Sequence, residues 1–475
     1  MNFSKKKIDY VLIFIFFYFC LSIISYKHNL SNFDKNNITD KGFYHVMIKG
    51  DAHRHLKHGA EIKKDLDEGI NYFKTGRDSF SEYIPARFAA AYYFLFDYDL
   101  FNNWDEKKIN LGIHSYYLLI QCVIYYFALF CLYLVISKQI PKKICFFITL
   151  FLGLEPTIFQ YHGTFWSESI FFSLQIFVLT FVMRKKISSL NFFWIGIFLA
   201  LLSIQRSPAI YYIIPIIIYF FVILKKENYS KILFILIGYT LITSFTGYHN
   251  YSRSGLFYVI PNEVRANLHL YLIPNIIDNE ARENEKKLAL DWIKKNKIEV
   301  DYENISKNEY KHIPHIFCEG PRIKSEKDKV KLCNYIKSRS KQLILDNPFK
   351  TLKYILYKSI YFPLLNPFHI YSDHRFVSGE VYYNTDTHDK LVPYRIAYTF
   401  LIYLISFFGL IKLLKEKNKK ILALIILSSI YFFIVISWHG NTRYFLPVLI
   451  YLSFFYGYGG VQATNFLNKK IFKNL

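Results

Sequence analysis

Long uninterrupted apolar runs constrain this chain more than any other feature of its sequence. Runs such as VLIFIFFYFCLSII and YYIIPIIIYFFVIL recur along its 475 residues, and each lies in a stretch long enough to cross roughly 30 Å of hydrocarbon. The composition, 53% hydrophobic and 20% aromatic, is typical of a polytopic membrane protein. A soluble globular enzyme, a disordered chain and a fibre are excluded.

About ten apolar spans predict an all-α polytopic membrane protein with about ten transmembrane helices. The spans lie near residues 8–26, 111–137, 144–161, 166–183, 190–205, 208–224, 232–248, 396–411, 421–438 and 444–461. The first is taken as a retained helix, because no A-x-A-like cleavage site follows it. We expect an N-terminal transmembrane module over 1–248 with a first loop at 27–110, a second large loop over 249–395, and C-terminal transmembrane helices over 396–475.

The basic residues predict how the chain is oriented. Of its 59 Lys and Arg residues, 20 lie at the termini and in short segments on one side of the spans. The three short loops on the other side hold only Arg206 and Arg443. Because Lys and Arg concentrate in cytoplasmic loops, both termini are predicted inside and both large loops outside. The Lys, Asn and Ile bias points to a bacterial inner membrane. The net charge of +23 is therefore mostly a topology signal, and nucleic-acid binding loses its support.

The first outer loop contains a polar segment, DAHRHLKHGAEIKKDLD, that begins at Asp51. Its pattern predicts a helix along the membrane interface to about Asp67, with Asp51, His55 and His58 on neighbouring turns. Three histidines within six residues also suggest a metal site, but His53, His55 and His58 do not share one helical face, so solvated or substrate-facing histidines are favoured. The alternative role for Asp51 is a helix N-cap.

Two carboxylates lie near the outer ends of the third and fourth spans. Glu168 begins the fourth span, where it could serve chemistry or only complement the helix dipole. Glu155 lies about a turn or two inside the third span, where it is protonated, paired with Arg206 or Arg443, or lining a site. Charged groups near membrane depth are costly and tend to be functional or paired.

Two arginines mark the short outer loops, in the sequences QRSP around Arg206 and WHGNTRY around Arg443. A half-buried guanidinium suits phosphate, which it can hold with paired hydrogen bonds. The alternative is an anchor to lipid headgroups.

Cys318 and Cys333 are the only cysteines in a predicted aqueous loop. Because that loop is expected outside the cytoplasm, a disulfide between them is predicted. Two unpaired thiols are the alternative.

Several short motifs together resemble the C-type glycosyltransferases. Within that class the likeness is to the dolichyl-phosphate-mannose protein mannosyltransferase-like group and its bacterial relatives that decorate lipids and glycans. The motifs are Asp51 beyond the first span, Tyr83-x-Pro85, Pro156 followed by Ser167-Glu168, Arg206-Ser-Pro208, and Arg443-Tyr444-Phe-Leu-Pro447. The family often has Tyr four residues after the first-loop Asp, where this chain has His55.

The resemblance implies a membrane enzyme that moves a sugar from a polyprenyl-phosphate donor to a lipid, glycan or protein acceptor at the extracytoplasmic face, with inversion. Asp51 would be the general base. Glu168 would orient the acceptor or share that role, and Arg206 and Arg443 would hold the departing phosphate. The other candidates for substrate contact are His53, His55, Tyr83, Arg87, Glu155, His162, His439 and Tyr444. No cofactor is implied, and a divalent metal is left open.

Three other functions compete with this one. An O-antigen ligase or polymerase-like enzyme would use Arg and His of the large loop and tolerate loss of Asp51. A transporter or flippase would show broken helices and polar groups near the midplane, and a structural subunit would carry no chemistry. The outer loop over 249–395, with its Lys-rich middle and an amphipathic stretch from Thr351 to Tyr371, has no counterpart in the resemblance; it is expected to cover the site or select the acceptor.

Overall fold

A computed structural model describes most of the chain. The described residues are 51–76, 82–96, 111–155, 158, 161–162, 165–185, 188–224, 226–261, 266–303, 313–319, 322–365, 385–416, 418–437 and 446–471. Within them the secondary structure is helical, and no strand occurs. The predicted first span, 8–26, lies outside the described residues.

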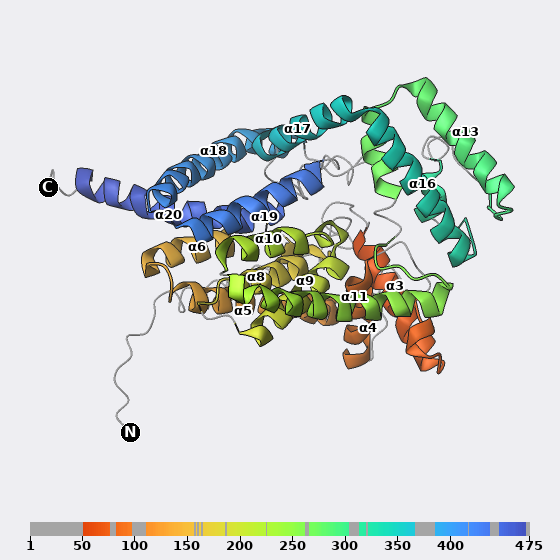
Figure 1. Cartoon of the computed structure of the whole chain (residues 1–475), viewed down its shortest axis with the longest axis horizontal. Helices are drawn as coiled ribbons and strands as arrows, with labels where there is room; N and C mark the ends of the chain where they lie inside the picture. Colours follow the sequence, from red (N-terminus) through yellow and green to blue (C-terminus); the bar gives the residue numbers. More distant parts are fainter. Residues whose placement is uncertain are drawn as a thin grey trace.

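Nine of the described helices form an elongated bundle (Figure 1). They are α5 (Leu111–Ile136), α6 (Lys142–Leu154), α8 (Glu168–Val182), α9 (Ser189–Gln205), α10 (Ile213–Ile223), α11 (Ile232–Ser254), α18 (Thr385–Lys415), α19 (Lys419–Ser437) and α20 (Leu446–Ile471). The C-terminal helix α20 packs against both α18 and α6, while α9 packs against α11 and α5 against α8. One apolar core cluster joins the N-terminal and C-terminal helices, so the two predicted transmembrane parts form a single packed unit.

The predicted spans from residue 111 onward each correspond to a helix of this bundle. Within the described ranges, three segments are long and apolar enough to cross a membrane: Tyr116–Ile136, Tyr229–Ser254 and Ile396–Lys415. Shorter apolar helices occupy Glu168–Val182, Ser189–Gln205 and Ser207–Ile223. These helices make the chain an integral membrane protein by length and composition. The total of about ten spans stays a prediction.

Two spans end at residues that hydropathy did not single out. Helix α11 continues past the predicted boundary at 248 because its polar last turns keep helical hydrogen bonds. It ends where Gly255 adopts the left-handed conformation, with φ of 74°, and donates to the Tyr251 carbonyl. Helix α6 stops at Leu154, short of the predicted 161, because Glu155 precedes Pro156 and a residue before proline disfavours the helical conformation.

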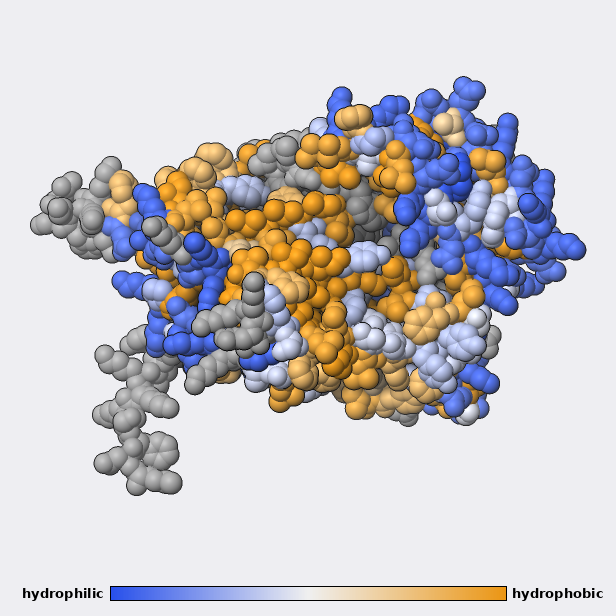
Figure 2. All heavy atoms as spheres, in the orientation of Figure 1, coloured by the Kyte–Doolittle hydropathy of each residue, from blue (hydrophilic) through white to orange (hydrophobic). Residues whose placement is uncertain are grey.

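The bundle has an apolar middle and two hydrophilic ends (Figure 2). The first, which we call the lysine end, carries the short links between helices, with exposed Lys138, Lys142, Lys143, Lys185, Lys415, Lys419 and Lys420. The second, the loop end, carries the segments predicted as outer loops (Figure 1). This asymmetry agrees with the predicted topology. The orientation itself stays a prediction.

At the loop end, α3 (Asp51–Asp67) and α4 (Tyr83–Phe96) form a tightly packed helical pair, joined through the short helix η1 (Tyr72–Lys74). The helix that the sequence predicted from Asp51 to about Asp67 is α3. Gly59 permits the close approach, since a Cβ there would lie 2.6 Å from the Cβ of Ala89 and 2.9 Å from the Ala86 carbonyl oxygen. Small residues therefore set how α4 lies on α3.

The segment between α11 and α18 has an apolar core of its own. It contains η4 (Leu268–Leu272), η5 (Ile273–Asn275), α13 (Asn279–Lys295), α15 (His315–Glu319), α16 (Glu326–Asp346) and α17 (Pro348–Leu365). The core residues are Ala266, Ile293, Ile298, Ile313, Phe317, Cys318, Ile323, Leu332, Cys333 and Ile336.

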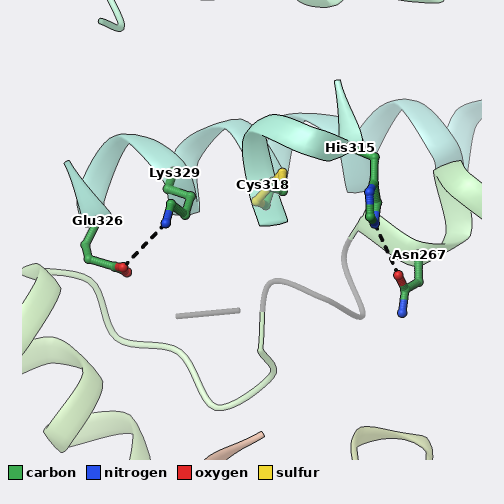
Figure 3. Close-up of a disulfide and its surroundings, with 6 residues drawn as sticks. Asn267, His315, Cys318, Glu326 and Lys329 are labelled. Atoms are coloured by element: carbon green, nitrogen blue, oxygen red, sulfur yellow. Dashed lines mark hydrogen bonds and ion pairs between the residues drawn. A yellow bond between two sulfur atoms is a disulfide. The ribbon is translucent and has the colours of Figure 1, made fainter. Parts of the chain in front are cut away.

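A disulfide between Cys318 and Cys333 ties α15 to α16, with Cα atoms 5.8 Å apart (Figure 3). Nearby, His315 lies 3.4 Å from Asn267, and Lys329 pairs with Glu326 at 3.8 Å. The short helix α15 is thus held at both ends, by the disulfide to α16 and by His315 to the chain before η4.

Candidate active site

The loop end contains a cleft between α3, α4 and the C-terminal turns of α11. The cleft is small and partly open to solvent. Its lining residues are His58, Ile62, Gly76, Glu82, Tyr83, Ala86, Arg87, Ile204, Asn250, Arg253, Tyr258, Val259 and Pro261. Two of the sequence-predicted contact residues, Tyr83 and Arg87, therefore lie together on one surface.

Arg87 is held in the cleft by groups that are not carboxylates. Its Nε donates to the Tyr72 hydroxyl at 3.2 Å, and its Nη1 donates to the Tyr83 carbonyl at 3.0 Å. Its Nη2 lies 3.2 Å from Nε2 of His249, and the guanidinium stacks 3.4 Å from the Tyr83 ring centroid. Among the described residues it forms no ion pair with a carboxylate. These contacts fix the orientation of the Arg87 guanidinium but do not neutralise its charge.

Tyr83 contributes a phenol to the same surface. Burial raises the pKa of its hydroxyl, and this outweighs the Arg87 charge, which lowers it. The Tyr83 hydroxyl therefore stays protonated over the physiological range and lies 3.2 Å from the Tyr72 hydroxyl. A protonated phenol beside a guanidinium is a pair of hydrogen-bond donors suited to an oxygen-rich ligand.

A second cation comes from the polar end of α11. Arg253 Nη2 donates to the Tyr258 hydroxyl at 2.6 Å and faces Asn250 Oδ1 at 3.3 Å, while its Nη1 donates to the Gly76 carbonyl. The sequence interpretation missed Arg253 and Asn250, because hydropathy ended the span at 248. The available signal was the helical spacing of His249 and Arg253, four residues apart at the end of an apolar run.

Glu168 and Arg206 form a buried ion pair beside the cleft. Their side chains are 2% and 6% exposed, and Arg206 Nη1 donates to Glu168 Oε1. Glu168 is the first residue of α8, where the helix dipole also favours its charge, and Arg206 follows the last residue of α9 in extended conformation. Arg206 is two residues beyond Ile204, which lines the cleft. The sequence offered Glu168 a role in chemistry or in complementing the helix dipole. The structure is consistent with both and adds the ion pair with Arg206.

The neighbouring polar residues are packed inside the bundle. Glu155 lies at the C-terminal cap of α6, not inside the helix as expected, and its Oε2 accepts a hydrogen bond from Tyr398 at 2.8 Å. His162 is buried, with Nδ1 at 2.8 Å from the Ser169 hydroxyl and its ring 4.3 Å from that of Tyr125. Neither residue lines the described cleft.

The α3 histidines have different environments. His58 lines the cleft, with Nδ1 at 2.8 Å from Glu61 Oε2. His55, expected to be solvated or to face substrate, is 2% exposed, because it lies on the same face of α3 as Gly59 and Ile62, which are both buried. Asp51 is the first residue of α3, but its side chain, like that of His53, lies outside the described residues.

Three further predicted residues, His439, Arg443 and Tyr444, lie outside the described residues altogether. Within the described part of the chain, no group of three His, Cys, Asp or Glu side chains could hold a metal ion. The role of a divalent metal therefore stays open.

Comparison with known proteins shows the fold of this chain. No protein-family model and no curated protein sequence matches it. Its structure is similar to that of the archaeal oligosaccharyltransferase AglB from Archaeoglobus fulgidus in complex with an inhibitory peptide and a dolichol-phosphate, with 12% sequence identity and a TM-score of 0.53. The match covers 99% of this chain and 52% of that one, so this chain spans about half the length of that protein. At this identity the likeness shows that the two proteins share a fold.

Proposed function

We propose that this protein is a membrane glycosyltransferase that moves a sugar from a polyprenyl-phosphate donor to an acceptor at the loop end of the bundle. The shared fold carries the proposal, because the similar structure is an oligosaccharyltransferase bound to a dolichol-phosphate. The cleft adds support from this chain's own residues. It lies at one end of an apolar bundle and presents Arg87 and Arg253 to a polar ligand, which suits a donor with a lipid tail and a phosphate head.

The proposed reaction is a single displacement at the anomeric carbon. The acceptor oxygen forms a bond to that carbon as the bond between the carbon and the lipid-phosphate oxygen breaks. Asp51 takes the proton of the acceptor hydroxyl, and the lipid phosphate leaves with the bonding electron pair. Attack opposite the leaving group inverts the anomeric carbon. Glu168 orients the acceptor or shares the role of base.

Arginines stabilise the negative charge that grows on the leaving phosphate. Arg206 and Arg443 were assigned this role from the sequence. Because Glu168 already neutralises Arg206 in the structure, we extend the role to Arg87, whose described contacts leave its charge available. Glu168 and Arg206 then have one of two roles. Either the ion pair separates and Arg206 contacts the donor, or the pair stays closed and fixes the shape of the site.

The test is transfer of radiolabelled sugar from a panel of polyprenyl-phosphate sugars by the full chain in nanodiscs. Wild type is compared with Asp51→Asn and with Asp67→Asn, a matched control at an exposed carboxylate on the same helix. Loss of a general base lowers the rate by about 100-fold or more, so Asp51→Asn is expected to lose transfer while Asp67→Asn keeps it.

Other outcomes separate the competing functions. Transfer that is equal in wild type and Asp51→Asn would remove Asp51 as the base and leave Glu168 as the next candidate. Binding of lipid-linked sugars without turnover would favour a flippase. Absence of both binding and transfer across the donor panel would contradict the proposed function.

A further inference from the structure

Helix α17 presents an apolar stripe that no described residue covers. Phe349, Leu352 and Leu356 are all more than half exposed, and Phe349 reaches 84%. Their spacing of three and four residues along α17 places them on one face of that helix. A large exposed apolar patch of this kind marks an interaction surface.

The opposite face of α17 is the one that packs on the protein. Thr351 is buried, and Tyr354 packs with Ile344 against the cluster of Leu272, Ile273 and Ile276. At 100° per residue, Thr351 and Tyr354 lie about 100° to 160° from Leu352 and Leu356. The stripe is therefore not the incomplete edge of the internal core, because the helix already has a packed side.

The helix that carries the stripe adjoins the apolar surface of the bundle. Helix α17 contacts α19 and α18 and lies next to α18 along the edge of the molecule (Figure 1). On α18 the exposed residues include Phe400, Leu404 and Phe407, which belong to a span long and apolar enough to cross a membrane. Because α17 adjoins this apolar helix, its stripe is suited to contact with lipid as well.

Charged and aromatic residues beside the stripe indicate the depth in the bilayer that suits it. Lys350 and Lys353 are exposed and lie on one side of the stripe, about 100° and 40° from Phe349. Tyr357 is exposed on the same flank. Lysines beside an apolar stripe extend toward headgroup phosphates, and tyrosine concentrates at the membrane interface.

We infer that α17 is a membrane-interface helix, with its stripe in the acyl region and Lys350 and Lys353 against the phosphates of anionic lipids. The segment predicted as an outer loop thus returns to the bilayer before α18 begins. Helix α17 then holds α13, α15 and α16 at the membrane surface, beside the loop end. This inference concerns the lipid contact of the helix and does not depend on the proposed function.

The experiment measures the position of α17 relative to the bilayer. A nitroxide is attached to Leu352→Cys or, as the matched position on the lysine side, to Lys350→Cys, in the full chain reconstituted in vesicles of phosphatidylcholine and phosphatidylglycerol. Both positions are exposed, so the labels leave the packed face intact, and parent protein treated in parallel gives the background from native cysteines. Collisions of the label with oxygen, which partitions into lipid, are compared with collisions with a water-soluble nickel complex.

At position 352 oxygen collisions are expected to exceed nickel collisions several-fold, with the reverse order at 350. Free access of the nickel complex to 352 would place the stripe in water and overturn the inference. A label at 352 shielded from both reagents would show that protein covers the stripe, from this chain or a second copy, and would overturn it equally.

The role of the lysines is tested by adding Lys350→Gln and Lys353→Gln to the labelled Leu352→Cys chain. With both lysines present, phosphatidylglycerol is expected to deepen the label relative to pure phosphatidylcholine, and the glutamine variant is expected to lose this response. A depth that is independent of phosphatidylglycerol in the lysine-containing chain would contradict the anionic-headgroup contact.

Discussion

Arg206 and Arg87 lie at the same end of the bundle but in opposite environments. Arg206 is 6% exposed and paired with Glu168, so its charge is neutralised inside the protein. Arg87 faces an open cleft and is held by a phenol, a carbonyl, an imidazole and an aromatic ring. The residue type is the same in both places. The partner decides whether the guanidinium serves the fold or is available to an anion.

The comparison has an energetic consequence. Removing one member of a buried ion pair leaves the other charge in a low-dielectric interior without compensation. Removing a cleft arginine exposes its former partners to water, which can replace the lost hydrogen bonds. Substitution at Arg206 should therefore act mainly on stability, and substitution at Arg87 mainly on ligand affinity.

The largest effect is expected for Arg206→Ala. Leaving Glu168 buried and unpaired should lower the free energy of unfolding by about 3–5 kcal/mol, measured by denaturation in nanodiscs. The double variant Glu168→Gln with Arg206→Gln removes both charges and should lose much less. Wild-type stability of Arg206→Ala would mean that the pair is open in the membrane, and the comparison with Arg87 would fail.

Arg87→Ala should weaken use of the lipid-phosphate donor while leaving the chain folded. A hydrogen bond to a charged group contributes about 1.5–3 kcal/mol, so KM for the donor should rise roughly 10- to 150-fold. Arg184→Ala is the matched control, because Arg184 also stacks on an aromatic ring, 4.3 Å from the Phe181 centroid, but at the lysine end. Equal donor KM in the Arg87 and Arg184 variants would argue against a phosphate contact at Arg87.

Gly59→Ala tests whether the cleft depends on how closely α3 and α4 pack. The new Cβ would clash with Ala89 and the Ala86 carbonyl, and overpacking of this kind costs about 1–3 kcal/mol. In the control Gly153→Ala, the Cβ would meet Leu129 at an ordinary 3.7 Å, so stability should hardly change. If Gly59→Ala matches that control in both stability and donor KM, the position of Arg87 does not depend on this contact.

The smallest effect is expected for Tyr72→Phe, which removes the hydroxyl that accepts from Arg87 Nε. One hydrogen bond of this type contributes about 0.5–1.5 kcal/mol, and donor affinity should fall by a similarly small amount as Arg87 loses part of its alignment. Tyr229→Phe removes a comparable hydroxyl contact at the lysine end and should not change donor KM. A larger loss at Tyr72 than at Arg87 itself would indicate a direct role for the Tyr72 hydroxyl.

The site was only partly predictable, and particular residues show why. Glu168 and Arg206 could be singled out because charged residues at the ends of apolar spans are rare, yet nothing in the sequence joined them across 38 positions. Tyr83 and Arg87 were recognisable as candidates on one loop, but His249 and Arg253 were not, because the hydropathy signal ends where α11 becomes polar. His55 was expected to be solvated or to face substrate, and its burial depends on how α3 packs in the folded chain.

The sequence by itself determined which segments are helical and apolar, and it predicted the topology and the cysteine pair, because membrane insertion depends on local hydrophobicity and local charge. It also indicated a class of fold that the similarity to an oligosaccharyltransferase supports. Only the tertiary structure decided which arginine is neutralised and which faces the cleft. That choice depends on contacts between residues far apart in the chain, such as Arg87 with His249, and their distances are set by the packing of whole helices.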